Sequence, residues 1–131
     1  MKFMLMKSGT MSASQTLLQL SPEELMAHIQ FMLDMQESLT KSGELVLAEG
    51  LEFPPSPKIV TAKRPDAPIV SDGPFPESKE FLAGFWIVDV ETPQRAIEIA
   101  AKASTAPGKG GAPMSLPIEV RQVMSGPPPT E

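Results

Sequence analysis

Residues 81–90 read Phe81-Leu-Ala-Gly-Phe-Trp-Ile-Val-Asp-Val90, and the alternation in this stretch decides the fold. Successive side chains of a strand point to opposite faces, so Phe85 and Ile87 lie on one face and Trp86 with its alternate neighbours on the other. Both faces are therefore apolar, which is typical of a strand that is packed on both sides. We predict a central strand over Gly84–Val90.

The strongest local signals predict a helix. Ser21 is placed to be the N-cap, Pro22 takes the first helical position, and Glu24 follows at the spacing of a capping box. Lys41-Ser42-Gly43 then supplies a C-terminal cation and a glycine stop. We predict a helix from about Pro22 to Ser42. The apolar stripe at helical spacing consists of Leu25, Ile29, Met32, Leu33 and Leu39.

The other elements follow from apolar runs and breaker residues. The stretch from Phe53 to Pro76 is so rich in proline that it accommodates only a short hairpin. A surface loop is predicted from Ser8 to Gln19. The remaining predicted strands are Phe3–Met6, Leu45–Ala48, Lys58–Lys63, Ile69–Val70 and Ile118–Met124, and a second helix runs from Pro93 to before Pro107 with an inner face of Ala96, Ile97, Ala100 and Ala103.

The element order is β-α-β, a hairpin insertion, and β-α-β again. This order predicts an α+β fold with a ferredoxin-like protomer of two split βαβ units, whose helices lie on the same face of the sheet. Met4 and Met6 make the other face apolar too, and a second copy of the sheet is its economical cover. We therefore expect a homodimer, a dimeric α/β barrel, of a single domain over residues 1–124, followed by a disordered Pro-rich tail at 125–131.

Composition excludes several classes of function. The formal net charge of −5 argues against a nucleic acid or an anionic membrane as partner, because both require clustered lysine and arginine. Without cysteine, and with His28 as the only histidine, the chain lacks the ligands of the usual metal sites, so we expect no metal and no cofactor. No apolar run approaches the roughly 20 residues of a membrane span or resembles a signal peptide, and the expected location is the cytoplasm.

Asp72 is the first candidate for chemistry, because it lies in an acidic turn just before the central strand. A carboxylate at a strand end beside apolar walls has a raised proton affinity and acts as a general acid or base. The alternative is that Asp72 closes an Asx turn together with Gly73 and Pro74.

Glu80 and Arg121 are candidate ligand contacts. Glu80 shares its loop with Glu77, and these carboxylates either divide acid and base roles or are simply solvated. Arg121 lies two residues after Glu119, so both side chains project from one strand face. Its guanidinium either clamps a carboxylate or phosphate or forms an ion pair with Glu119 or Glu49.

His28 and Trp86 are the remaining candidates. Only His28 has an unperturbed pKa near neutrality, so it is a general base if it faces the sheet from the first helix. The alternative is a half-buried structural histidine. Trp86 either forms the wall of a ligand pocket or belongs to the core or an interface.

A set of residues spread along the chain carries a family resemblance: Asp72-Gly73-Pro74-Phe75, Glu77, Lys79-Glu80, Gly84-Phe85, Asp89-Val90, Ala96, Ala100 and Glu119-Val120-Arg121. In these residues the chain resembles the YCII-related superfamily, and within it the DGPF-domain branch, over residues 1–124. The resemblance implies a dimeric α+β barrel with a ferredoxin-like protomer. The wider group often has a histidine or an aromatic residue where this chain has Met32, whereas His28 lies one turn earlier.

Three functions remain open. The first is a small-molecule binding or regulatory module, in which Asp72, Glu80 and Arg121 orient a small polar or anionic ligand between the sheet and the first helix. The second is a cofactor-independent acid–base enzyme of the isomerase or lyase type that uses Asp72 or His28 on a carbonyl compound. The third is a structural dimer or a module for a protein partner.

Overall fold

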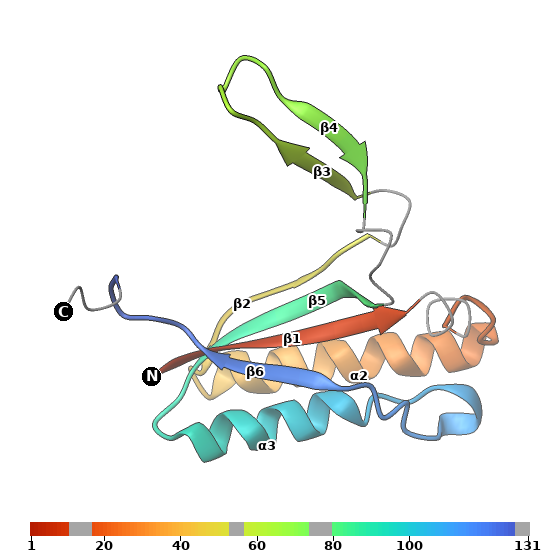
Figure 1. Ribbon diagram of the computed structural model, residues 1–131. Coiled ribbons are helices and arrows are strands. Elements are labelled where there is room, and N and C mark those ends of the chain that lie inside the picture. Colours follow the sequence, from red (N-terminus) through yellow and green to blue (C-terminus); the bar gives the residue numbers. More distant parts are fainter. Residues whose placement is uncertain (11–16, 53–56, 74–79, 128–131) are drawn as a thin grey trace.

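The computed structural model describes residues 1–10, 17–52, 57–73 and 80–127 (Figure 1). The elements with bounds among these residues are two α-helices, a four-stranded sheet and a separate two-stranded hairpin, so the fold is α+β. The elements are β1 (Lys2–Thr10), α2 (Pro22–Lys41), β2 (Leu45–Gly50), β3 (Lys58–Thr61), β4 (Ile69–Asp72), β5 (Glu80–Asp89), α3 (Pro93–Ser104), the 3₁₀ turn η1 (Lys109–Gly111) and β6 (Ile118–Gln122).

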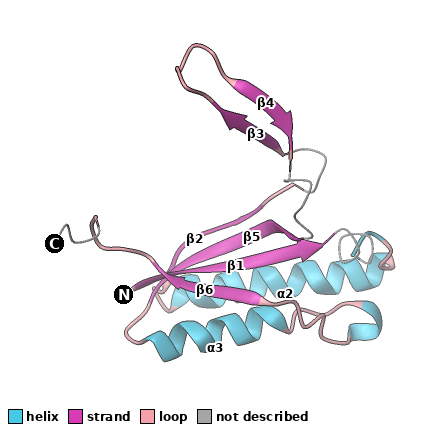
Figure 2. Ribbon diagram, in the orientation of Figure 1, coloured by secondary structure: helices cyan, strands magenta, loops and turns pink. Residues whose placement is uncertain are grey.

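The larger sheet is antiparallel throughout, with the strand order β2-β5-β1-β6. Both helices lie against one face of this sheet (Figures 1 and 2). In the register of β1 and β5, Phe3 lies opposite Val88 and Leu5 lies opposite Trp86. All four of these side chains are buried, so they define the face that the helices cover.

The hydrophobic core fills the space between the sheet and the helices. Leu5 and Val88 have no exposed surface, and burying side chains of this size contributes roughly 2 kcal/mol each. Partly buried residues of β6 extend the core to the edge of the sheet. The buried cluster comprises Phe3, Leu5, Met35, Leu39, Trp86, Val88, Val90, Ala96, Ile99, Ala100 and Ala103.

Both ends of α2 are held as the sequence predicts. Ser21 and Glu24 form a reciprocal capping box, with the Glu24 amide donating to the Ser21 hydroxyl and the Ser21 amide donating to the Glu24 carboxylate. At the other end Gly43 has a φ of +79°, the left-handed conformation that favours glycine. The Glu44 amide donates to Leu39 and the Gly43 amide to Thr40, which is the Schellman arrangement.

The side of α2 that faces the core differs from the prediction. Of the predicted stripe, Leu25, Ile29 and Leu33 are exposed. The buried residues of α2 are instead His28, Met35 and Leu39. The apolar residues cover more than one side of the helix, so periodicity alone could not select the inner face, and packing against the sheet did.

Two further expectations need correction. In α3 the inner face contains Ile99, whereas Ile97, which we predicted there, is 51% exposed. The first strand does not end at Met6 but continues to Thr10, through residues predicted as loop. After a register shift between Lys7 and Ser8, β1 continues to pair with the start of β5. The polar side chains of this segment do not prevent the pairing, because the hydrogen bonds between strands join backbone groups.

The proline-rich insertion forms the predicted hairpin, β3 paired with β4. This hairpin projects away from the larger sheet on the side opposite the helices (Figures 1 and 2). Its apolar side chains Val60, Ile69 and Val70 are all exposed. The predicted roles of Pro74, Phe75, Glu77 and Lys79 lie outside the described residues, as do the last four residues of the predicted disordered tail.

Candidate ligand-binding site

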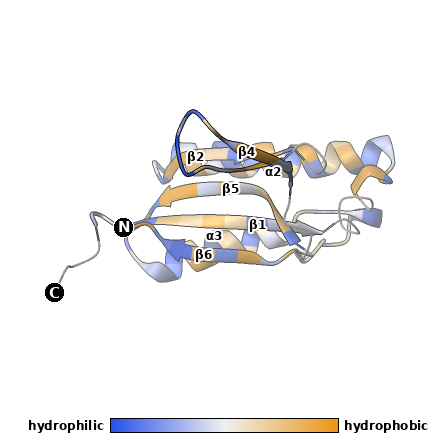
Figure 3. Ribbon diagram, turned by 45° about the horizontal axis from the view of Figure 1, so that its top comes forward, coloured by the Kyte–Doolittle hydropathy of each residue, from blue (hydrophilic) through white to orange (hydrophobic). Residues whose placement is uncertain are grey.

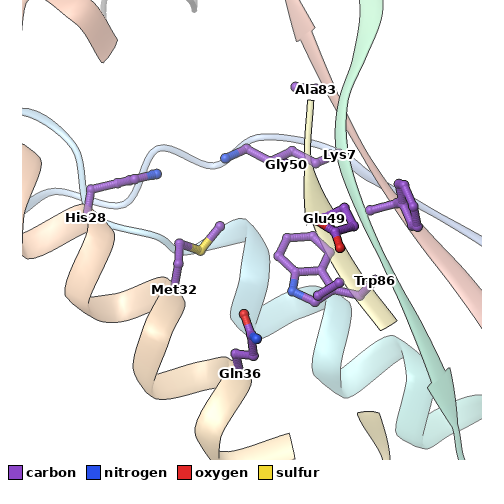
Figure 4. A pocket seen from close by; sticks show the side chains of 11 residues that line it. Lys7, His28, Met32, Gln36, Glu49, Gly50, Ala83 and Trp86 are labelled. Atoms are coloured by element: carbon purple, nitrogen blue, oxygen red, sulfur yellow. The ribbon is translucent and has the colours of Figure 1, made fainter. Parts of the chain in front are cut away.

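A cavity of about 530 Å³ lies between α2 and the sheet, beside the end of β2 and the middle of β5. A cavity of this size is in the range that accommodates small molecules. Figure 4 shows side chains from α2 and from the strands lining the same space. The lining residues are Lys7, His28, Met32, Gln36, Ala48, Glu49, Gly50, Ala83, Gly84, Phe85 and Trp86.

Lys7 brings a cation into this cavity from β1. In the sheet it lies opposite Gly84 on β5 and opposite Ile118 on β6. A Cβ at Gly84 would be 3.1 Å from the Glu49 carbonyl oxygen, so this glycine permits the close approach of β2. Partial burial lowers the pKa of Lys7, because desolvation disfavours the ammonium. None of the ion pairs found among the described residues includes Lys7. The cation therefore lines the cavity without a carboxylate partner in the described part of the chain.

His28 lies on the inner side of α2 and is only 6% exposed. Its Nδ1 is 2.9 Å from the carbonyl oxygen of Pro107. A carbonyl only accepts hydrogen bonds, so Nδ1 carries the proton and Nε2 of the neutral ring is an acceptor. Desolvation lowers the pKa of His28, and the positive charge of Lys7 lowers it further, against the opposing effect of the Pro107 hydrogen bond. The ring is therefore neutral near pH 7 and, as Figure 4 shows, points toward Lys7.

Trp86 supplies an aromatic wall from β5. It is 7% exposed and belongs to the hydrophobic core, yet it also lines the cavity, so both predicted roles hold together. In Figure 4 its indole lies toward Gln36 and Met32 of α2. Glu49 of β2 also borders the cavity, but it lies opposite Phe85 in the register, so its carboxylate projects from the face of the sheet away from the helices.

Asp72 lies away from this cavity. It is in the hairpin, where it forms an exposed ion pair with Lys58. The hydrogen bond and the charge of Lys58 lower the pKa of Asp72, whereas we predicted a raised proton affinity. The physical reason is that the hairpin leaves Asp72 in water beside a cation instead of beside apolar walls.

Glu80 and Arg121 do not line the cavity either. Glu80 begins β5, pairs with Thr10 in the sheet and is exposed. Arg121 lies opposite Met4, on the face of the sheet that the helices leave uncovered. In the part of the chain that the structure describes, no ion pair joins Arg121 to Glu119 or Glu49. Of the predicted site residues, the structure brings together His28 and Trp86.

Lys7 is the site residue that reasoning from the sequence missed. A signal for it was present, because Lys7 continues the alternation of Phe3 and Leu5 on the buried face of β1. A lysine at the third position of such a series points into a packed layer or a cavity.

The described residues contain no group of three or more potential ligands that could hold a metal ion. Within the same residues, neither helix is long and apolar enough to cross a membrane.

Comparison with known proteins gives one positive finding. The sequence model of the YCII-related domain matches residues 1–112, which is most of the chain. A search of curated proteins found no match.

Proposed function

The chain belongs to the YCII-related domain family, and from this premise we propose that it is a small-molecule binding or regulatory module that takes a small polar or anionic ligand in the cavity beside Lys7. The observation that carries the proposal is the ammonium of Lys7, which has no carboxylate partner among the described residues, in a cavity that also contains the neutral His28. The sequence predicted Asp72, Glu80 and Arg121 as ligand contacts. In this proposal the ligand instead contacts Lys7, His28 and Trp86.

Magnitudes indicate what the cavity needs besides charge. An anion about 4 Å from an ammonium gains roughly 4 kcal/mol at an effective dielectric constant of about 20, before desolvation costs. That gain alone corresponds to a dissociation constant of about 1 mM. Tighter binding therefore requires apolar contact as well, which Trp86 and Met32 offer from opposite sides of the cavity.

An acid–base enzyme is the second candidate, and the state of His28 favours it. Its tautomer is set by Pro107, and its Nε2 is unprotonated at neutral pH and directed toward the cavity. A general base needs this combination of geometry and protonation state. Asp72 has neither the position nor the raised pKa for that role, so His28 is the base of this candidate mechanism.

We also propose that the protein is a homodimer with a ferredoxin-like protomer, of the dimeric barrel type. The strand order and the two helices on one face support the protomer. The uncovered face of the larger sheet, here called the open face, supports the dimer, since helices shield only the other side. Apolar residues are frequent along the strands of the sheet and in β4, as the colours of Figure 3 show. Those on the open face are Met4, Met6, Leu47, Phe85 and Ile87.

The Asp72-Gly73-Pro74-Phe75 string supports placing the chain in the DGPF branch of the family. Because the net charge of −5 disfavours a nucleic acid, we expect self-association and a small molecule to be the relevant partners.

The binding proposal is tested by measuring ligand affinity through Trp86, the only tryptophan of a chain without tyrosine. Small carboxylates, phosphate esters and phenols would be titrated while its fluorescence and the thermal midpoint are followed. We expect Lys7→Met to reduce the affinity of the ligands that bind at least tenfold, because it removes the charge and keeps an apolar stem.

Lys2→Met is the matched control, since Lys2 is an exposed lysine on the same strand and does not line the cavity. The binding proposal is wrong if Lys7→Met and Lys2→Met lower the affinity equally, or if no compound of the panel binds. If the wild-type protein converts a bound carbonyl compound and His28→Gln does not, the result would favour the enzyme over the binding module.

A further inference from the structure

We propose that the group recognised in this cavity is an acidic hydroxyl, that of a phenol or an enol, which accepts a hydrogen bond from Lys7 and donates one to His28. The inference rests on the proposed function and names the ligand class of the same site. It follows from the hydrogen-bonding capacities of the two side chains.

The two side chains have opposite requirements. Lys7 carries an ammonium, which has only donors and attracts negative charge. His28 offers Nε2, which is an acceptor because Nδ1 is committed to Pro107. They point toward one another in Figure 4, yet no hydrogen bond between them is found among the described residues. A ligand group between them therefore has to accept from one and donate to the other.

Comparing functional groups leaves few that satisfy both requirements. A carboxylate suits Lys7 but has only acceptors, so it would leave Nε2 of His28 without a donor. An ammonium suits His28 but is repelled by Lys7. An ordinary alcohol suits both but gains little from the positive charge. An acidic hydroxyl suits both and is further stabilised by Lys7 when its proton leaves.

The proton transfer itself is balanced without a further reactant. The O–H bond of the bound phenol or enol breaks, its electron pair stays on oxygen beside the Lys7 ammonium, and Nε2 of His28 gains the proton. The resulting imidazolium is close to Lys7, and the new oxyanion between the two cations offsets their repulsion. Glu49 borders the cavity, but its carboxylate projects from the opposite face of the sheet, away from the oxyanion.

The walls of the cavity favour a flat, conjugated ligand. The indole of Trp86 and the thioether of Met32 line the space beside the polar pair (Figure 4). Aromatic rings and thioethers both form favourable contacts with a further ring. Conjugation is also what makes a hydroxyl acidic, so the polar and the apolar parts of the site point to the same class of compound.

The experiment uses 4-nitrophenol, because its phenolate is coloured and its protonation state can be read while it is bound. We expect wild-type protein to lower the apparent pKa of bound 4-nitrophenol by about one unit or more, a tenfold change in the ratio of phenolate to phenol. Lys7→Met should abolish this shift, and Lys2→Met should preserve it. Thermal midpoints of the variants show whether each is folded.

Two further ligands make the outcome decisive, even for a variant that does not fold. The ether 4-nitroanisole lacks the hydroxyl and should bind wild type at least tenfold more weakly than 4-nitrophenol. The carboxylate 4-nitrobenzoate tests simple anion binding. Suppose that 4-nitrobenzoate binds in a Lys7-dependent manner, while 4-nitrophenol binds with an unchanged pKa or no tighter than the ether. That result would overturn the hydroxyl inference and leave the binding proposal standing. Both are overturned if no ligand shows dependence on Lys7.

Discussion

At the scale of single residues, Lys7 occupies a position in β1 where the alternation of side chains would place a core residue. Phe3 and Leu5, which precede it on the same face of β1, are buried. The fold tolerates a cation there because the cavity beside Gly84 keeps the ammonium partly hydrated. The cost of this partial desolvation appears as the lowered pKa of Lys7. An anionic ligand would recover part of that cost.

The charge of Glu49 leads to a prediction about affinity. Its carboxylate projects from the open face of a strand that borders the cavity, so across the sheet it repels an anionic ligand and attracts the ammonium that the ligand would use. Replacing it by glutamine keeps the size and removes the charge. We expect Glu49→Gln to tighten binding of an anionic ligand by about threefold to tenfold, measured by Trp86 fluorescence. Glu52→Gln, outside the cavity, is the control, and equal affinities in all three proteins would contradict the prediction.

A second prediction at this scale concerns pH and the pair Glu44–Arg95. Arg95 donates from Nε and from a terminal nitrogen to the two oxygens of Glu44, at 2.8 and 2.9 Å. These hydrogen bonds lower the pKa of Glu44 from 4.5 to about 2. The unfolded chain therefore takes up the proton first as the pH falls. The stabilisation is complete above pH 4.5 and is lost as the pH falls toward 2.

We expect Glu44→Gln to reduce the free energy of unfolding by on the order of 1 kcal/mol at neutral pH, since Arg95 is partly exposed and solvent screens the pair. The difference from wild type should disappear at about pH 2. Urea denaturation at both pH values measures it. Glu37→Gln, which removes an exposed pair with Lys41, is the control. A difference that stays constant with pH would show that the pair contributes through packing rather than through charge.

At the scale of elements, α2 forms one wall of the cavity, and the contacts at its two ends fix the position of this helix. The capping box at Ser21 holds the start of the helix, and Glu24 also accepts a hydrogen bond from the Gly110 amide, which fastens η1 to it. Pro107, just before that turn, accepts from His28. The loop after α3 therefore orients the imidazole of His28. The capping residues of α2 hold this loop in place, so they fix the geometry of the site as well as the start of the helix.

The C-terminal end of α2 yields a prediction about stability. Gly43 has a φ of +79°, and a Cβ there would meet no atom within 4 Å, so any penalty for alanine comes from the backbone conformation. We expect Gly43→Ala to lower the free energy of unfolding by about 1 kcal/mol. Chemical denaturation followed by circular dichroism measures this. Gly126→Ala is the control, because Gly126 has an open environment and no positive φ. A neutral Gly43→Ala would mean that the helix end relaxes without cost.

At the scale of the whole molecule, one face of the four-stranded sheet has no cover among the residues that the structure describes. The helices lie on the other face, and the β3–β4 hairpin extends beyond the open face without packing on it (Figure 1). Exposed Ile69 and Val70 on this hairpin add to the apolar surface. A contiguous apolar surface of this kind marks an interaction site in a folded protein.

The open face leads to a prediction about assembly. We expect a dimeric mass by light scattering at micromolar concentration, and a monomeric mass for Ile87→Lys, because Ile87 lies at the centre of the open face between Met4 and Leu47. Ile97→Lys is the matched control, since Ile97 is exposed on α3 and lies on the helical side. Wild-type protein that is monomeric under these conditions would contradict the dimer.

The sequence predicted the elements more reliably than the site. The caps of α2, the hairpin and the central strand were predictable because each depends on neighbouring residues. The inner sides of both helices were partly mispredicted, as Ile29 and Ile97 show, because apolar residues on several sides leave that choice to packing. Asp72 was a candidate because it belongs to a motif, but the structure pairs it with Lys58, which is fourteen residues earlier in the chain.

By itself, the sequence determined the α+β class, the order of the elements and an apolar second face of the sheet, since alternation and capping act over a few residues. Only the tertiary structure decided the candidate site. Lys7, His28 and Trp86 are far apart in the chain, and they meet because β1 pairs with β5 while α2 lies against the same face of the sheet. Pro107 then sets the tautomer of His28 through a contact that spans 79 residues. Contacts over such separations depend on the packing of the whole fold, which local patterns do not encode.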